Sequence, residues 1–286
     1  MKRFLSLLLI ALIVLPSLSL LASCNSVSDS QGLAFTLSDG SITIDGIGSC
    51  TDKYITIPAS IDGVAVTAIA PSAFEGSSVT GVTIPASVTT IGASAFSDCE
   101  KLSSAFVSGS VTEIPENCFK NCSSLKKLAI ENGVSSIGRS AFENCGSLTG
   151  VLVPSTVVSV EKRAFADCGA LRSAEFDKGV VTIGDEAFMD CAALRTVKLP
   201  KSLESIGKRT FSGCSSLSSF LVPKGVLSIG KNAFENCDRL ERIKFERPSG
   251  WHNPNWSEET VPDFSDPRAA RDYFKTGQPE IRIEKP

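Results

Sequence analysis

Apolar side chains recur along this chain with a fixed period of 23 residues, and the register does not slip over seven repeats. A column of phenylalanines is followed, three positions later in every repeat, by a column of cysteines. The phenylalanines are Phe96, Phe119, Phe142, Phe165, Phe188, Phe211 and Phe234, and the cysteines are Cys99, Cys122, Cys145, Cys168, Cys191, Cys214 and Cys237. Such a period is typical of a solenoid, in which each repeat forms one coil and stacks on its neighbours.

The spacing of apolar residues inside one repeat predicts the shape of a coil. In "LKKLAIENGVSSIGRSAFENC", Leu128 and Ile130 are two positions apart, Val134 and Ile137 follow, and no helical period extends beyond about two turns. We expect a short strand, a turn, a second short extended segment and one helical or 3₁₀ turn. The recurring "IG" glycines are expected at turns. Proline follows the first strand in several coils, where we expect it to end the strand ladder without breaking it; these are Pro85, Pro154, Pro200 and Pro223.

The N-terminal end of the array departs from the repeat. Residues 34–44 alternate apolar and polar side chains around Asp39-Gly40, which predicts a β-hairpin over the open end of the first coil. The segment from Tyr54 to Ala70 is a longer, atypical first unit. This end of the solenoid is therefore predicted to carry a β cap.

At the C-terminal end the period stops after Phe245. Asp266 or Ser265 can cap a helix that has Pro267 in its first turn and Gly277 at its end. Aromatic side chains are expected to cover the last coil; they are Trp251, Trp256, Phe264, Tyr273 and Phe274. This end of the solenoid is therefore predicted to carry a helical cap.

The first 23 residues have the layout of a secretory signal peptide, with Lys2 and Arg3 before a long apolar stretch and small residues. A plain transmembrane anchor explains the apolar run equally well, but "LASC" resembles a bacterial lipobox, whose cysteine is lipidated. Cys24 is therefore the candidate lipidation site. The chain then divides into a signal peptide (1–23), a lipidated tether (24–32), an N-terminal β cap (33–53), a solenoid (54–246) and a C-terminal cap (247–286).

The charge of the chain argues against nucleic-acid binding. The sequence has 28 basic and 31 acidic side chains, so removal of the signal peptide with Lys2 and Arg3 leaves a formal charge of −5. No other stretch is long and apolar enough to span a bilayer.

Units such as "LTGVLVPSTVVSVEKRAFADC" and "LRTVKLPKSLESIGKRTFSGC" resemble the BspA-type leucine-rich repeats of bacterial surface proteins. The resemblance extends from Tyr54 to Phe245. It implies a β-rich α/β leucine-rich-repeat solenoid that is right-handed, with 23-residue coils, a parallel sheet on the concave face and short helical or 3₁₀ turns. It also implies adhesion to host proteins, host cells or other bacteria, without a catalytic residue, a cofactor or a small-molecule substrate.

The cysteine column allows three interpretations. Free cysteines in register can form a buried structural ladder, because neighbouring coils bring them to about 4.8 Å and cysteine packs as a small hydrophobe. Disulfides are sterically conceivable in a secreted protein, although the ladder has an odd number of members. Metal binding by Cys118 and Cys122 lacks a second ligand pair. Catalysis is equally weakly supported, since His252 is the one histidine and has no obvious nucleophile near it.

The candidate binding site is the outward column of the first strands. If positions such as Val82 and Ile84 point inward, the residue between them points outward. This column begins with apolar residues and ends with charged ones. With Lys127 from the preceding outward column, the candidate partner-binding residues are Phe106, Lys127, Ala129, Leu152, Glu175, Lys198, Leu221 and Lys244.

Two functions remain open at this point. The first is a lipid-anchored protein of the outer membrane or cell surface that binds a host extracellular-matrix or cell-surface protein, or another bacterial surface protein. The second is an envelope scaffold or assembly lipoprotein that faces the periplasm and has no host partner. An apolar stripe at Phe106, Ala129 and Leu152 is compatible with a partner site, but isolated apolar residues are also common on protein surfaces.

Overall fold

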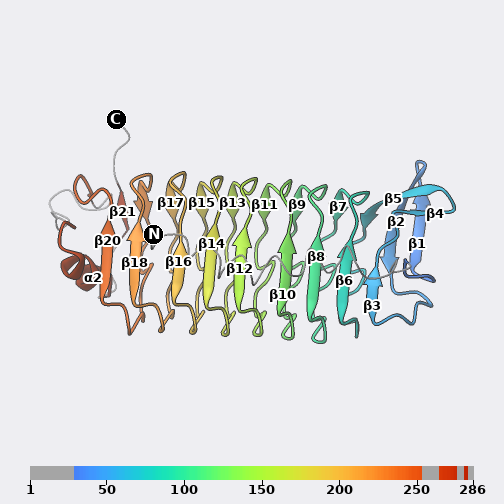
Figure 1. The fold of residues 1–286 in the computed structure, drawn as a ribbon, viewed down its shortest axis with the longest axis horizontal. Coiled ribbons are helices and arrows are strands. Elements are labelled where there is room, and N and C mark those ends of the chain that lie inside the picture. The colour runs from blue at the N-terminus through green and yellow to red at the C-terminus, as the bar shows by residue number, and fades with distance from the viewer. Residues whose placement is uncertain (1–28, 253–263, 276–279, 283–286) are drawn as a thin grey trace, which may run out of the picture.

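The computed structural model shows coils stacked in one row, with a β cap at one end and a helical cap at the other (Figure 1). It describes residues 29–252, 264–275 and 280–282. Each regular coil contributes one long strand and one two-residue strand, so two parallel ladders run along the solenoid. The predicted solenoid is confirmed.

The long strands pair in register at one repeat period, for example Val82 with Ala105 and Phe220 with Ile243. They are β3 (Tyr54–Thr56), β6 (Gly81–Ile84), β8 (Ser104–Val107), β10 (Lys127–Ile130), β12 (Gly150–Val153), β14 (Ser173–Phe176), β16 (Thr196–Lys198), β18 (Ser219–Val222) and β20 (Arg242–Phe245). The short strands are β7 (Thr90–Ile91), β9 (Glu113–Ile114), β11 (Ser136–Ile137), β13 (Ser159–Val160), β15 (Thr182–Ile183), β17 (Ser205–Ile206) and β19 (Ser228–Ile229).

The prediction that proline ends the ladder without breaking it is wrong at two places. The long-strand sheet is interrupted between β10 and β12 and again between β16 and β18. Pro154 and Pro223 follow β12 and β18, at the position where Asp177 donates its N–H to the carbonyl of Val153 at 3.0 Å. Proline has no N–H, so this bond between coils is lost. The prediction holds at Pro85 and Pro200, where the bond is lost as well but β3–β6 and β14–β16 stay paired over three residues, so proline alone does not interrupt the sheet. Where the position is not proline, as in β12–β14 and β18–β20, all four residues pair.

The third side of each coil is a series of hydrogen-bonded turns that does not continue into a helix. In one coil Ala141 and Glu143 donate to carbonyls three residues back, whereas Phe142 and Asn144 donate to the next coil, both at 2.8 Å. Ser140 and Asn144 have φ of 52° and 59°. A helix uses consecutive N–H groups internally, and these alternate between the coil itself and its neighbour, so only isolated turns form.

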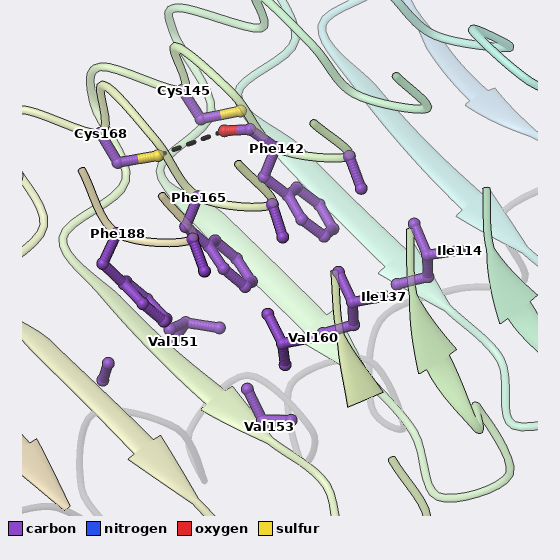
Figure 2. Packing of buried hydrophobic residues seen from close by; sticks show 14 of the residues in the cluster. Ile114, Ile137, Phe142, Cys145, Val151, Val153, Val160, Phe165, Cys168 and Phe188 are labelled. Atoms are coloured by element: carbon purple, nitrogen blue, oxygen red, sulfur yellow. Dashed lines mark hydrogen bonds between the residues drawn. The ribbon is translucent and has the colours of Figure 1, made fainter. Parts of the chain in front are cut away.

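The core is built from the phenylalanine and cysteine columns (Figure 2). Rings from Phe74 to Phe234 stack on those of the next coil, with centroids 5.0–5.7 Å apart and planes within 15°. The rings lie between the cysteine side of the coil and the strands. The "IG" glycines allow coils to approach closely rather than supplying a special turn, because a Cβ on Gly138 would lie 2.7 Å from the carbonyl oxygen of Ile114.

The N-terminal hairpin is confirmed. It consists of β1 (Ala34–Ser38) and β2 (Ser41–Gly46), which pair around Asp39-Gly40. β2 joins β5 (Val64–Ile69), which also pairs with β4 (Ser60–Ile61) and β7. Ser30 falls inside the segment predicted as tether, yet it is buried and donates its N–H to the carbonyl of Thr56 at 3.0 Å. Ser30 is therefore part of the folded cap and not of a free tether.

The C-terminal cap is the helix α2 (Pro267–Lys275) together with β21 (Ile281–Arg282), which pairs antiparallel with β19. Asp266 accepts the N–H of Arg268 at 2.8 Å, so it is the N-cap that the sequence predicts. Phe264, Phe274 and Trp251 are buried around Phe245. Trp256 and Gly277 lie outside the described residues.

Candidate surface for partner binding

The outward face of the long-strand sheet carries the predicted column, and the structure places its members as the alternation requires. Leu152 and Leu221 are each 46% exposed, the largest apolar exposures on this column. Lys127, Lys198 and Lys244 are also exposed, whereas Phe106, Ala129 and Glu175 are half-buried. Leu152 is therefore a more accessible contact than Phe106.

Register decides which of these residues are neighbours. Thr83 pairs with Phe106 and Phe106 pairs with Ala129, so these three form a continuous apolar strip across β6, β8 and β10. Leu152 lies on β12, beyond the interruption of the sheet. Its partner across the next ladder is Glu175, which begins the charged part of the face.

The charged part includes one ion pair. Lys198 donates to a carboxylate oxygen of Glu175 at 2.8 Å, and Leu221 pairs in register with Lys244 on the last coils. The Lys198 side chain is 51% exposed, so its ion pair with Glu175 adds little to the free energy of unfolding. The face thus changes from apolar to charged along the solenoid, as the sequence indicates.

Tyr54 extends the apolar part and was missed by the sequence argument. Its hydroxyl lies 3.0 Å from the Thr83 hydroxyl, and its ring passes across Gly81, where an added Cβ would collide with the Tyr54 ring carbons. Tyr54 remains 42% exposed. The sequence does show Gly81 at the first strand position of the following coil. Only the structure shows that the Tyr54 ring occupies the space next to this glycine.

The cysteines form a structural ladder rather than a reactive site. Each column member is buried and donates its S–H to the carbonyl of a phenylalanine in the preceding coil, at 3.0–3.2 Å (Figure 2). Burial raises the pKa of Cys168 to about 12 and raises the pKa of Cys145 as well. The thiolate is the nucleophile and metal ligand, so these protonated thiols are inert. The described cysteines are all free.

A charged cluster on the turn side was also missed. Arg163 donates to Glu143, Asp167 and Glu186 at 2.9–3.2 Å, so it joins three consecutive coils. Burial by itself would raise the pKa of Glu143, but the hydrogen bonds from Arg163 and Ser140 lower it below its usual value. Lys120 and Lys162 also pair with Glu143 and Glu186, at 3.5 and 3.9 Å. Three cations therefore balance the three carboxylates, and the cluster acts as a brace between coils.

Other chemistry finds little support in the described residues. Within residues 29–252, 264–275 and 280–282, no three His, Cys, Asp or Glu side chains gather in a way that could hold a metal ion. His252 joins the cap through its backbone, which pairs with Arg282. In the same part of the chain no helix is long and apolar enough to cross a bilayer.

Comparison with known proteins identifies the repeat. Residues 48–172 and 158–250 match the BspA type leucine rich repeat region, in 6 copies. The chain belongs to this family. BspA-type repeats therefore account for the whole solenoid, and the resemblance in the sequence is confirmed. No curated protein matches the sequence.

Solved structures of leucine-rich repeat proteins are similar to this chain. The leucine rich repeat protein of T. pallidum, TpLRR, is 30% identical with a TM-score of 0.60, over 67% of this chain and 91% of that one. A Bacteroides ovatus leucine-rich repeat protein is 20% identical over 78% and 88%, with a TM-score of 0.36. The pneumococcal vaccine antigen PcpA is 19% identical over 77% and 81%, with a TM-score of 0.39.

Proposed function

We propose that this protein is a lipid-anchored cell-surface protein that binds or adheres to other macromolecules through the outward face of its long-strand sheet. The partner is a host extracellular-matrix or cell-surface protein, or another bacterial surface protein. Membership of the BspA-type family supports protein binding in general. The observation that carries the choice of surface is the apolar strip of Tyr54, Thr83, Phe106 and Ala129, which leads to the exposed Leu152.

Leu152 is the residue with which to test the surface. Its side chain is 46% exposed, so Leu152→Asp leaves the core untouched. Interface hot spots need large side chains that can be desolvated, and a carboxylate at this point opposes desolvation. We expect the variant to bind cultured host cells and immobilised extracellular-matrix proteins at least about tenfold more weakly, a loss of ~1.4 kcal/mol.

Val158→Asp is the matched control. Val158 is 51% exposed and precedes the short strand β13, away from the long-strand sheet. Both variants should keep the melting temperature of the parent protein. If Val158→Asp weakened binding and Leu152→Asp did not, recognition would lie on another side of the solenoid.

Anchoring rests on Cys24, which is outside the described residues. Residues 25–29 would separate a lipidated Cys24 from Ser30, which is bonded into the cap, and they reach at most about 18 Å. The solenoid would then stay close to the bilayer. We expect Cys24→Ala to release the protein from membranes or to leave it unprocessed.

Two results would contradict the anchored surface protein. A Cys24→Ala variant that still fractionates with membranes and is cleaved at the same place would exclude lipidation as the anchor. Protection of the parent protein from protease added to intact cells would favour the periplasm-facing scaffold instead.

A further inference from the structure

The ends of the strand ladders differ in how they are closed. At the front of the long-strand sheet, Ser30 bonds to Thr56 and so occupies the edge of β3. At the back of the short-strand ladder, β21 pairs with β19 and Arg282 also pairs with His252. The β1 strand pairs with β2 on one side, and no described residue pairs with its other edge. Figure 1 shows β1 at the N-terminal extreme of the row.

β1 carries none of the features that usually protect an edge strand. Natural edges are blunted by charged side chains, by proline or by a covering segment. The sequence of β1 is "AFTLS", and all five residues are exposed. Phe35 and Leu37, at 43% and 59% exposed, pair with the buried Ile44 and Ile42. The side chains of Phe35 and Leu37 lie on the same face of the hairpin as those of Ile44 and Ile42, but they remain exposed to solvent.

The turn fixes which backbone groups point to the open edge. Ser38 and Ser41 flank a two-residue turn, Asp39-Gly40, whose φ angles are 50° and 72°. In such a hairpin the flanking pair is hydrogen bonded, and hydrogen-bonded and open pairs then alternate. The N–H and C=O groups of Phe35 and Leu37 therefore point away from β2, toward the open edge.

We propose that β1 pairs antiparallel with β1 of a second copy of this chain, so that the two solenoids join at their N-terminal caps. A two-fold axis at Thr36 places Phe35 opposite Leu37 of the other copy and Leu37 opposite its Phe35. Both pairs use the outward backbone groups, and all four apolar side chains lie on one face. β1 contains no charge, so this register places no like charges opposite each other.

The free edge of β1 fits β1 of a second copy better than it fits the C-terminal end of a second copy. The strands at the C-terminal end are occupied, because α2 and its aromatic residues pack on β20 and β21 is paired with β19. Among the described strands, β4 is the other outer strand of the same sheet, but it has only 2 residues, so another β1 offers the longer edge for pairing. The interface is therefore isologous, which closes as a dimer and does not propagate into a fibre.

The contact is small, which sets its strength. Two five-residue strands bury far less than the roughly 1,200 Å² of the smallest stable interfaces, so the dimer in solution is weak and depends on concentration. If the chain is anchored in a membrane, as proposed above, tethering raises the effective concentration of neighbouring copies. Dimerisation is then favoured at the membrane.

Cross-linking tests the register directly. In a Cys50→Ser background of the full chain, Thr36→Cys places cysteines opposite each other in an open pair, with Cα atoms about 4.5 Å apart. Mild oxidation of membranes, and of the soluble Cys24→Ala chain at high concentration, should give a disulfide-linked dimer on a non-reducing gel. Leu37→Lys in the same background should lower the cross-linked fraction about tenfold, equivalent to ~1.4 kcal/mol.

Ser38→Cys is the matched control. It is on the same face of β1, but the proposed register pairs it with Ala34 of the other copy and separates the two cysteines by about 14 Å. Equal cross-linking of both cysteine variants would overturn the register. A protein that stays monomeric at every concentration would overturn the dimer, and the partner of the β1 edge would then be a strand of another protein. Leu152→Asp should not change cross-linking, so failure of this proposal and failure of the binding surface are distinguishable.

Discussion

At the scale of single residues, each cysteine of the repeating column is a hydrogen-bond donor as well as a packing group. The carbonyl of Phe119 accepts the N–H of Cys122 in its own coil at 3.3 Å and the S–H of Cys145 in the next coil at 3.2 Å. A buried carbonyl has two acceptor sites, and the thiol fills the second one. This explains why a small side chain with a weak donor recurs here, where alanine would only pack.

The buried thiols make the stability of the fold sensitive to alkaline pH. Burial raises the pKa of Cys168 to about 12, whereas an exposed thiol titrates near 8.5. Because the folded pKa is raised, the contribution of each thiol is complete below about pH 8.5 and is lost as the pH rises toward the folded pKa. Each thiol can contribute a slope of up to ~1.4 kcal/mol per pH unit. We expect urea midpoints to fall steeply from about pH 8 to pH 10.

Cys168→Ala provides the control for this slope. The variant is less stable at neutral pH because it lacks buried atoms, but its stability should fall less steeply with pH. A midpoint that stays constant to about pH 10, or a slope that Cys168→Ala leaves unchanged, would show that the thiols do not govern alkaline stability.

At the scale of secondary-structure elements, the length of each long-strand ladder depends on one backbone position per coil. Asp177 donates to Val153, and Glu246 donates in the same way to Val222 at 3.0 Å, so β12–β14 and β18–β20 are fully paired. Pro154 and Pro223 lack the same donor in the coils that follow the two interruptions. Pro85 and Pro200 lack it too, but β3–β6 and β14–β16 remain paired over three residues, so the missing bond shortens a ladder and does not by itself divide the sheet.

Pro154→Ser should restore the missing bond between β10 and β12. The new N–H can donate to the carbonyl of Ile130, which is worth ~1 kcal/mol, while loss of proline makes the unfolded chain more flexible by a similar amount. Stability should therefore change little. The measurement is hydrogen exchange, in which the amide of residue 154 should be protected.

Asp177→Pro is the reverse change. It should remove the bond to Val153, lower stability by about 1–3 kcal/mol, and speed exchange along β14. Rapid exchange at residue 154 of the Pro154→Ser variant would mean that something other than the missing N–H separates β10 from β12.

At the scale of the whole molecule, the solenoid is held by contacts between neighbouring coils. Strand register, ring stacking, thiol hydrogen bonds and the Arg163 cluster all join a coil to the next one or two. Stability in such an array is close to a sum of coils and their interfaces. The length of the array can therefore change by whole coils.

Deletion of residues 192–214 should give a folded protein one coil shorter. The deletion removes one period, so Phe188 can stack on Phe234 where it now stacks on Phe211. Tyr54 and Leu152 are retained, so partner binding should survive. Small-angle scattering should show a length reduced by about 4.8 Å, and circular dichroism should show an unchanged strand signal per residue.

Deletion of residues 192–203 is the matched control. It removes about half a coil and places apolar side chains out of register with the core, so this variant should be unfolded or aggregate. If both deletions folded equally well, the 23-residue register would not be what joins the coils.

The sequence by itself determined the solenoid, its period, the inward columns and both caps, and it placed the cysteines in one column without deciding among a buried ladder, disulfides and a metal site. These follow from local alternation and from a strict repeat, because identical coils in register must bring identical positions together. The N-cap was narrowed to Asp266 or Ser265 in the same way, since helix capping needs only neighbouring residues, and the structure selects Asp266.

Tertiary structure decided what depends on the contact between particular coils. The sheet is interrupted between β10 and β12 and between β16 and β18, which a strict repeat does not predict, and Phe106 is half-buried while Leu152 is exposed because their neighbours differ. Tyr54 covers Gly81 and Arg163 joins three coils through side chains whose direction the repeat does not fix. The free edge of β1 was hidden for the same reason: a hairpin is predictable from local sequence, but whether anything pairs with its outer strand depends on the rest of the fold.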